Sequence, residues 1–164
     1  MKLMLNSIIA TLQAKSMTID LKDFYLSTPM SQYKYSRMKL DLFPLDVINE
    51  YGLLSNVDTN GNVFCEVKWS MYGLPHAGIL AQELLTEQLP KAGYTHSATT
   101  PGYWKHQRQP LSFTLVVNDF GVKCINQTDA EHLPVVLKND YEYVTDWNGT
   151  CYFGLTIDWN YTSS

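Results

Sequence analysis

A chain of 164 residues, of which 45% are apolar and 13% aromatic, can build the core of one ordinary domain, and this composition excludes a disordered tail. Its 12 Lys and Arg against 16 Asp and Glu give a net charge of −4, so any binding to nucleic acid needs a local basic surface. No run reaches the roughly 18 apolar residues of a membrane span, and three scattered cysteines predict neither a zinc site nor a disulfide framework, which favours an intracellular protein of the cytoplasm or nucleus.

The first half of the chain predicts two helices and three strands. Apolar residues at near-helical spacing predict a helix over residues 3–14. The short β-branched segment 17–19 predicts a buried strand that delivers Asp20 at its end. Further elements expected here are strands over 36–42 and 63–69, a helix over 44–51 and a turn over 58–61.

The second half begins with the clearest helix, over 77–91, which we expect to stop at Gly93. Two apolar arms, 113–117 and 120–124, predict a hairpin with Asn118 and Asp119 as its turn. A capping box at 128–131 predicts a helix to about residue 138, kinked by Pro134, and strands over 141–144 and 151–157 are expected to complete the sheet. Together these elements predict one α+β domain.

Two acidic residues, Asp20 and Asp119, lie at expected strand ends. If the two strands are neighbours, their carboxylates form an oxygen site of the kind that Mg²⁺ prefers. Two such ions about 4 Å apart can activate a primer 3′-hydroxyl and stabilise the leaving pyrophosphate. Asn118 and Asp119 also have a simpler interpretation, because both residue types tolerate positive φ and are common in hairpin turns.

Four blocks, TIDLKDFYLSTPM, MYGLPHAGILAQ, LVVNDFGVK and YFGLTID, follow one another between residues 18 and 158. In this order they resemble the reverse transcriptase of long-terminal-repeat retrotransposons, the copia-like and gypsy-like polymerases. The resemblance implies an antiparallel palm sheet backed by helices, with partial fingers, as a single domain over 1–164 that is truncated at both ends and lacks the thumb and ribonuclease H. It implies DNA synthesis on an RNA or DNA template-primer from dNTPs with two Mg²⁺.

The resemblance also assigns roles to individual residues. Asp20 and Asp119 would be metal ligands and, with Asn118, the catalytic residues. Tyr25, or Phe24 beside it, would be the steric gate that disfavours a 2′-hydroxyl on the incoming sugar. The other assignments are backbone amides of Leu21 and Lys22 near the triphosphate, nucleotide and template contacts from His76, Ala77 and Gly78, and a primer grip at Phe153 and Gly154.

Asn118 departs from the family pattern, since it stands at the position of the first Asp of a pair. An amide adds no negative charge beside the cations, and we expect this to cost several kcal/mol of transition-state stabilisation. At ~1.4 kcal/mol per factor of ten, activity would fall about a thousandfold or more, which predicts an impaired polymerase. The alternative is a relic that binds nucleic acid or acts as a scaffold without catalysis. An Asp-based phosphohydrolase is disfavoured because the chain has no Gly-rich phosphate loop.

Two surface features keep two interpretations each. His76 either contacts the nucleotide or caps a helix start through a side-chain hydrogen bond. Tyr94, Tyr103 and Trp104, close to Lys105, either stack on bases within a small basic strip or pack as an ordinary hairpin.

Overall fold

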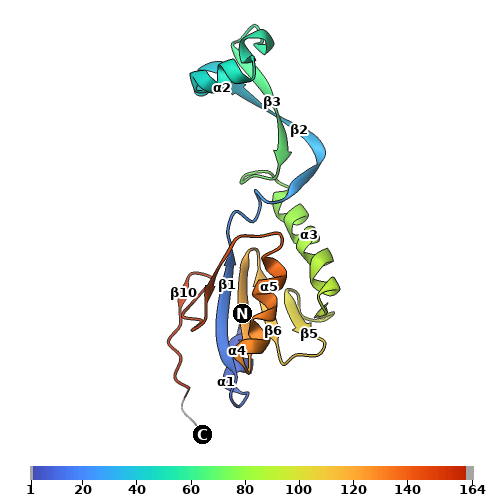
Figure 1. The fold of residues 1–164 in the computed structure, drawn as a ribbon, viewed down its shortest axis with the longest axis vertical. Coiled ribbons are helices and arrows are strands. Elements are labelled where there is room, and N and C mark those ends of the chain that lie inside the picture. Colours follow the sequence, from blue (N-terminus) through green and yellow to red (C-terminus); the bar gives the residue numbers. More distant parts are fainter. Residues whose placement is uncertain (1, 162–164) are drawn as a thin grey trace.

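The computed structural model describes residues 2–161. Its centre is a six-stranded sheet with the strand order β4-β5-β6-β7-β1-β8, in which every neighbouring pair is antiparallel (Figure 1). The strands are β1 (Lys15–Leu21), β4 (Tyr94–His96), β5 (Tyr103–His106), β6 (Ser112–Val116), β7 (Asp119–Cys124) and β8 (Tyr143–Asp146). β1 lies between β7 and β8 although β7 follows it by about a hundred residues, so the sheet joins distant parts of the chain.

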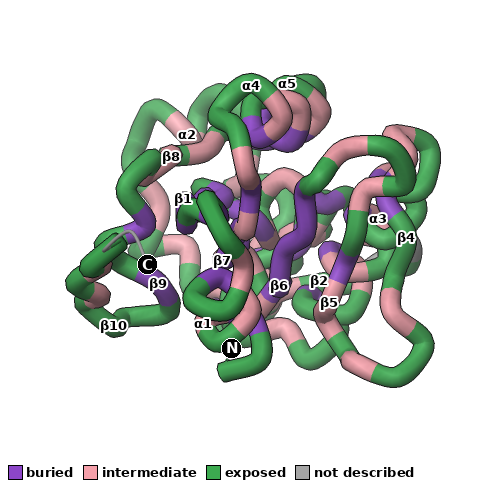
Figure 2. The backbone as a smooth tube through the Cα atoms, turned by 90° about the horizontal axis from the view of Figure 1, so that it is seen from below, coloured by how far each residue is buried: buried purple, intermediate pink, exposed green. Residues whose placement is uncertain are grey.

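Helices cover the sheet and close its core. They are α1 (Lys2–Ile9), α3 (Ala77–Lys91), α4 (Gln127–Ala130) and α5 (His132–Leu137). Strand residues Ile19, Phe113 and Phe120 pack in one cluster with Leu85 of α3 and Leu133 of α5, all at most 1% exposed. Figure 2 shows the buried residues gathered along β1, β6 and β7. An antiparallel sheet with packed helices agrees with the expected α+β class.

A two-stranded arm projects away from this sheet (Figure 1). It consists of β2 (Pro29–Lys39) and β3 (Asn62–Trp69), and its tip carries α2 (Leu45–Glu50) between 3-10 helices at Leu40–Leu42 and Leu53–Asn56. The strand expected over 36–42 begins earlier and ends at Lys39, whereas the expected strand 63–69 and helix 44–51 agree with the structure to within one residue at each end.

The expectations for the helices are met unevenly. α3 has the predicted bounds, and Gly93 behind it has φ +87°, a conformation that favours glycine and ends the helix. α1 ends at Ile9, earlier than the predicted 14. The predicted helix from 128 to 138 is wrong as one kinked element, because it divides at Glu131 into α4 and α5. Pro134 has no N–H to donate to the carbonyl of residue 130, so the helical hydrogen bonds are interrupted there.

The predicted capping box is also wrong. Thr128 lies inside α4, and the residue that precedes this helix, Asn126, makes no side-chain capping bond. A reciprocal capping box needs the hydroxyl at the position before the first helical turn, two residues earlier than Thr128 stands.

The expected last strand, 151–157, does not complete the sheet. It forms a separate hairpin of β9 (Cys151–Tyr152) and β10 (Leu155–Thr156). Its Tyr152 is 2% exposed and lies against Gly121 of β7, while its hydroxyl pairs with the Thr114 hydroxyl at 2.9 Å and donates to the Thr114 carbonyl at 3.2 Å. Packing of this aromatic ring on a glycine therefore places the hairpin over the sheet face. Among residues 2–161 no helix has the length and apolar character of a membrane span.

Candidate functional site

The two acidic residues singled out above lie directly opposite each other. Asp20 is near the end of β1, Asp119 begins β7, and the two are register partners. The amide of Leu21 donates to the carbonyl of Asn118 at 3.1 Å, which makes Asp20 and Asp119 a non-hydrogen-bonded antiparallel pair. In such pairs the Cα atoms are about 4.5 Å apart and the side chains are closest. Two carboxylates thus converge at one end of the sheet.

The turn between β6 and β7 differs from the expectation. Asp119 already pairs with Val116, so the two turn residues are Val117 and Asn118 rather than Asn118 and Asp119. The positive φ, +59°, belongs to Val117, a β-branched residue that rarely adopts it. Such backbone strain costs about 1–3 kcal/mol and persists only where the surroundings impose it. The ability of Asn and Asp to take positive φ therefore does not explain this turn.

Asn118 connects the β6–β7 turn to β1 through its side-chain amide. Its Nδ2 donates to Asp20 Oδ1 at 2.5 Å and to the carbonyl of Leu21 at 3.2 Å. Both partners are acceptors, so the amide nitrogen and not its oxygen must face them. The side chain thus holds one oxygen of Asp20 with a neutral donor, in a place where a carboxylate would meet two acceptors.

The second acid of the pair, Asp119, has a raised pKa. Burial, and then the negative charge of Asp20, raise the pKa of Asp119. The folded protein therefore binds this proton more tightly than the unfolded chain does, and stability falls as the pH rises through the unfolded value of about 4 and levels off above the raised pKa. A cation between the carboxylates would relieve this repulsion.

Asp119→Asn is expected to stabilise the fold at pH 7 without divalent ions, by at most about 1 kcal/mol because the site is partly solvated. The variant should also lose the part of the pH dependence that begins at the unfolded value of about 4. Urea unfolding in a chelating buffer at a series of pH values from about 4 upward measures both effects. Asp41→Asn, at an exposed Asp of the arm, is the control and should change neither; a less stable Asp119→Asn would contradict the expectation.

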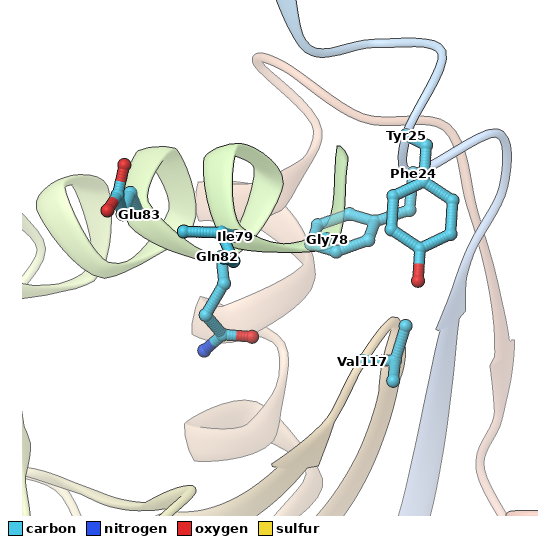
Figure 3. A pocket seen from close by; sticks show the side chains of 7 residues that line it. All are labelled: Phe24, Tyr25, Gly78, Ile79, Gln82, Glu83 and Val117. Atoms are coloured by element: carbon cyan, nitrogen blue, oxygen red, sulfur yellow. The ribbon is translucent and has the colours of Figure 1, made fainter. Parts of the chain in front are cut away.

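A surface pocket of about 400 Å³ lies between the start of α3, the segment that follows β1 and the tip of the β6–β7 hairpin (Figure 3). Its wall consists of Phe24, Tyr25, Gly78, Ile79, Gln82, Glu83 and Val117. Phe24 is only 2% exposed and belongs to the core, whereas Tyr25 is half-buried and packs edge-on against Tyr72 with ring centroids 5.0 Å apart. Of the two aromatics considered as a steric gate, Tyr25 is therefore the one with surface available to a ligand.

The wall also contains residues that sequence reasoning missed. These are Gln82 and Glu83, which line the pocket on the same helix as Gly78. At Gly78, which the sequence did assign, an added Cβ would make ordinary contact with the Tyr25 ring at 3.7 Å. A signal for Gln82 existed, because residues four apart on a helix share a face and Gly78 was already assigned. Tyr72 had no such signal.

The assigned backbone amides are not available. The amide of Leu21 donates to Asn118, and that of Lys22 donates to the carbonyl of Glu142 at 2.8 Å. Both N–H groups already donate to backbone carbonyls of neighbouring segments, so the expectation that they meet a triphosphate is wrong for this structure. The pairing of β1 with β7 and β8 on both sides is the reason.

The residues assigned at the start of α3 are separated by burial. His76 is exposed and makes no capping hydrogen bond through its side chain, so the alternative of a helix cap is not observed. Ala77 is 3% exposed, and its side chain faces the interior.

Phe153 and Gly154, assigned to a primer grip, form the turn between β9 and β10 with φ of +51° and +71°. These positions leave the predicted roles of His76, Gly78 and Phe153 as predictions.

The strip of aromatic residues near Lys105 is mainly core. Tyr94 and Trp104 are at most 1% exposed, so their rings cannot stack on bases. Tyr103 is half-buried, and the Lys105 ammonium lies 5.5 Å from its ring centroid. The interpretation as an ordinary packed hairpin describes this region.

The carboxylates at the hairpin tip supply fewer ligands than the two Mg²⁺ that the resemblance implies would need. Within the described residues, no group of three or more His, Cys, Asp or Glu is placed to share a metal ion. Asp20 and Asp119 supply two carboxylates, which suits one Mg²⁺ that keeps water as its other ligands. A second ion lacks a third carboxylate, because Asn118 presents a donor to Asp20. The residues therefore fit one cation and not two.

No family model matches the sequence, and no curated protein is significantly similar to it. Two solved structures resemble the fold at 12% identity: apo telomerase from Candida tropicalis truncated from its C-terminal domain, with a TM-score of 0.45 over 96% of this chain, and telomerase from Candida albicans in complex with a TWJ fragment of telomeric RNA, with 0.44 over 88%. The chain spans only 36% and 28% of those chains. A likeness this distant assigns no function.

Proposed function

We propose that this chain is a palm-like part of a reverse transcriptase of the long-terminal-repeat retrotransposon type, whose reaction is template-directed DNA synthesis from dNTPs. The observation that carries the proposal is the pairing of Asp20 with Asp119 at a strained hairpin tip. The four sequence blocks support it independently, since the first and third deliver these two residues. The arm of β2 and β3 would correspond to the partial fingers.

In this proposal each side chain has a limited task. Asp20 and Asp119 hold a divalent cation, which when bound supplies Lewis-acid activation of the primer hydroxyl. Tyr25 lines the pocket at the tip of the β6–β7 hairpin and would exclude a 2′-hydroxyl. Asn118 leaves the site one negative charge short, so this copy would be impaired.

Cation binding is measurable without synthesis. Mn²⁺, titrated into the full chain and followed by electron paramagnetic resonance, should occupy one site. Asp20→Asn should abolish that site, and Asn6→Asp, which adds a carboxylate to α1, a helix without acidic residues, should leave it unchanged. Equal Mn²⁺ binding by the wild type and Asp20→Asn would overturn the assignment of the ligands.

Synthesis is measured by primer extension on an RNA template. In the Asn118→Asp background, incorporation of dNTPs should require Asp20, because two-metal transfer depends on the remaining carboxylates. Incorporation that persists after Asp20→Asn would remove the proposed function.

The second candidate is a nucleic-acid-binding module without catalysis, and the arm favours it. The register pairs Tyr35 with Glu66 and Arg37 with Phe64, so these four side chains share one face, with Lys39 next along β2. Glu66 and the ion pair of Arg37 with Asp58 offset part of the positive charge of this face. Tyr35 and Phe64 are 64% and 59% exposed although both are large rings. Two exposed rings with Lys39 nearby suit a single strand, whose bases stack while a phosphate meets the ammonium group.

Tyr35→Ala is expected to weaken binding of a labelled single strand by about 1–3 kcal/mol, the value of one stacked base. Lys39→Gln should instead reduce the slope of log affinity against log salt by about 0.7, since it removes one phosphate contact. Fluorescence anisotropy at several salt concentrations measures both, with Lys91→Gln on α3 as the control. Absence of binding at low salt would eliminate this candidate.

A further inference from the structure

A second polar site lies at the other end of the sheet from the acidic pair. Lys105 of β5, Ser112 of β6 and Lys123 of β7 are consecutive register partners, so they form one row on one face. Neighbouring strands are about 4.8 Å apart, which places the two lysine backbones roughly 10 Å apart on either side of the Ser112 hydroxyl. This row is built by the sheet and does not depend on a flexible loop.

Lys123 is held in position by α1 and the segment behind it. Its Nζ donates to Ser7 Oγ and to Thr11 Oγ1, both at 2.7 Å. A lysine ammonium has three donors, so one remains for a further acceptor. Burial, and then the positive charge of Lys105, lower the pKa of Lys123.

The row faces a pocket of about 350 Å³ with no Asp or Glu among its lining residues. Within the described part of the chain the ion pair present is Arg37 with Asp58 in the arm, so neither pocket lysine has a carboxylate partner. In a protein of net charge −4 this is a local excess of positive charge. An anion is the ligand that would neutralise it.

Gln109 adds a requirement for a proton donor. It lines the same pocket, and its buried Oε1 has no hydrogen-bond partner among the described residues. A buried acceptor without a donor costs about 1–3 kcal/mol. The complementary ligand therefore combines negative oxygens for the two lysines with one O–H for Gln109.

We propose that this pocket binds inorganic hydrogen phosphate, which keeps at least one P–OH group at neutral pH. Lys105 and Lys123 meet its charged oxygens, and a protonated oxygen donates to Gln109. The site is distinct from the acidic pair, because Lys123 lies four residues beyond Asp119 on β7 and Tyr152 covers Gly121 between them. It does not depend on the function proposed above.

The test is a titration of the full chain, followed by two-dimensional NMR, with inorganic phosphate, with a nucleoside 5′-monophosphate and with sulfate. Saturable shifts at Lys105, Ser112 and Lys123 are expected with phosphate. The monoester loses most of its P–OH proton above its second pKa of about 6, and sulfate carries no proton at neutral pH. Both should therefore bind at least about tenfold more weakly than inorganic phosphate.

Three variants make the test specific. Lys105→Gln changes an exposed side chain and should weaken phosphate binding about tenfold, the value of one charge-assisted hydrogen bond. Gln109→Met should reduce the preference for phosphate over sulfate while the protein stays folded. Lys91→Gln should change nothing. Equal phosphate affinity in the wild type and Lys105→Gln, or equal affinity of the wild type for phosphate and sulfate, would overturn the proposal.

Discussion

Asn118→Asp is expected to raise Mg²⁺-dependent primer extension about a thousandfold when the chain is joined to the fingers and thumb of an active polymerase. The reason is charge: the variant adds a third carboxylate next to Asp20 and Asp119, which face each other. Two divalent ions then have about three negative charges around them, as two-metal transfer requires. Equal activity of the two forms would show that the missing charge is not what limits synthesis.

The same substitution should have the opposite effect on stability when no metal is present. In the wild type the Asn118 amide donates to Asp20 and to the carbonyl of Leu21. A carboxylate cannot donate to either, so Asn118→Asp should lower the free energy of unfolding by about 1–3 kcal/mol in a chelating buffer. Added Mg²⁺ should restore much of this loss, because it binds the folded state alone.

A matched control separates the site from the general effect of charge. Asn6→Asp changes the same residue type at an exposed position of α1, a helix without acidic residues. Its stability should not depend on Mg²⁺, and its extension activity should equal that of the wild type. Thermal unfolding of both variants with and without Mg²⁺ gives a result even if synthesis is below detection.

Gly121→Ala is expected to be the most damaging small substitution near the site. A Cβ at this position would lie 2.7 Å from Tyr152 Cζ and 2.8 Å from its Cε1, far inside van der Waals contact. The ring cannot move away freely, since it is 2% exposed and its hydroxyl is bonded to Thr114. Overpacking of this kind costs about 1–3 kcal/mol, which corresponds to a fall in Tm of several degrees, roughly 2–4 °C per kcal/mol, in a domain of this size.

The rescue by a second substitution identifies the cause. If the clash is with the ring, Gly121→Ala should cost much less in a Tyr152→Ala background, with a coupling of about 1 kcal/mol or more. Gly78→Ala is the control for stability, because its Cβ would make ordinary contact at 3.7 Å and helix propensity favours alanine. Additive effects of Gly121→Ala and Tyr152→Ala would show that the hairpin of β9 and β10 is not held by this contact.

Local pattern was enough for most of the elements and for the residues at their ends. The helix over 77–91 was predicted with its observed bounds, because its apolar residues recur at helical spacing and a glycine follows. The positions of Asp20 and Asp119 at strand ends were likewise predicted from the sequence, since runs of strand-forming residues stop beside them. The failures are also local in origin: Pro134 was assigned a kink, but its missing N–H divides the helix instead.

Partners across the sheet were not readable from any single segment. Which of Phe24 and Tyr25 enters the core depends on the helix and strands around them, and the positive φ of Val117 depends on the pairing of Val116 with Asp119. The hairpin of β9 and β10 packs on the sheet instead of extending it, because the Tyr152 ring lies over Gly121. This contact joins residues about thirty positions apart.

The sequence by itself therefore determined the kinds of elements and which of them carry acids, amides and rings, because these follow from the spacing of side chains along a short segment. Only the tertiary structure decided that Asp20 and Asp119 face each other, that the Asn118 amide donates a hydrogen bond to Asp20, and that two lysines share a row on the same sheet. The physical reason is that strand register arises from packing and hydrogen bonding between distant segments, and a shift by one residue would send each side chain to the opposite face.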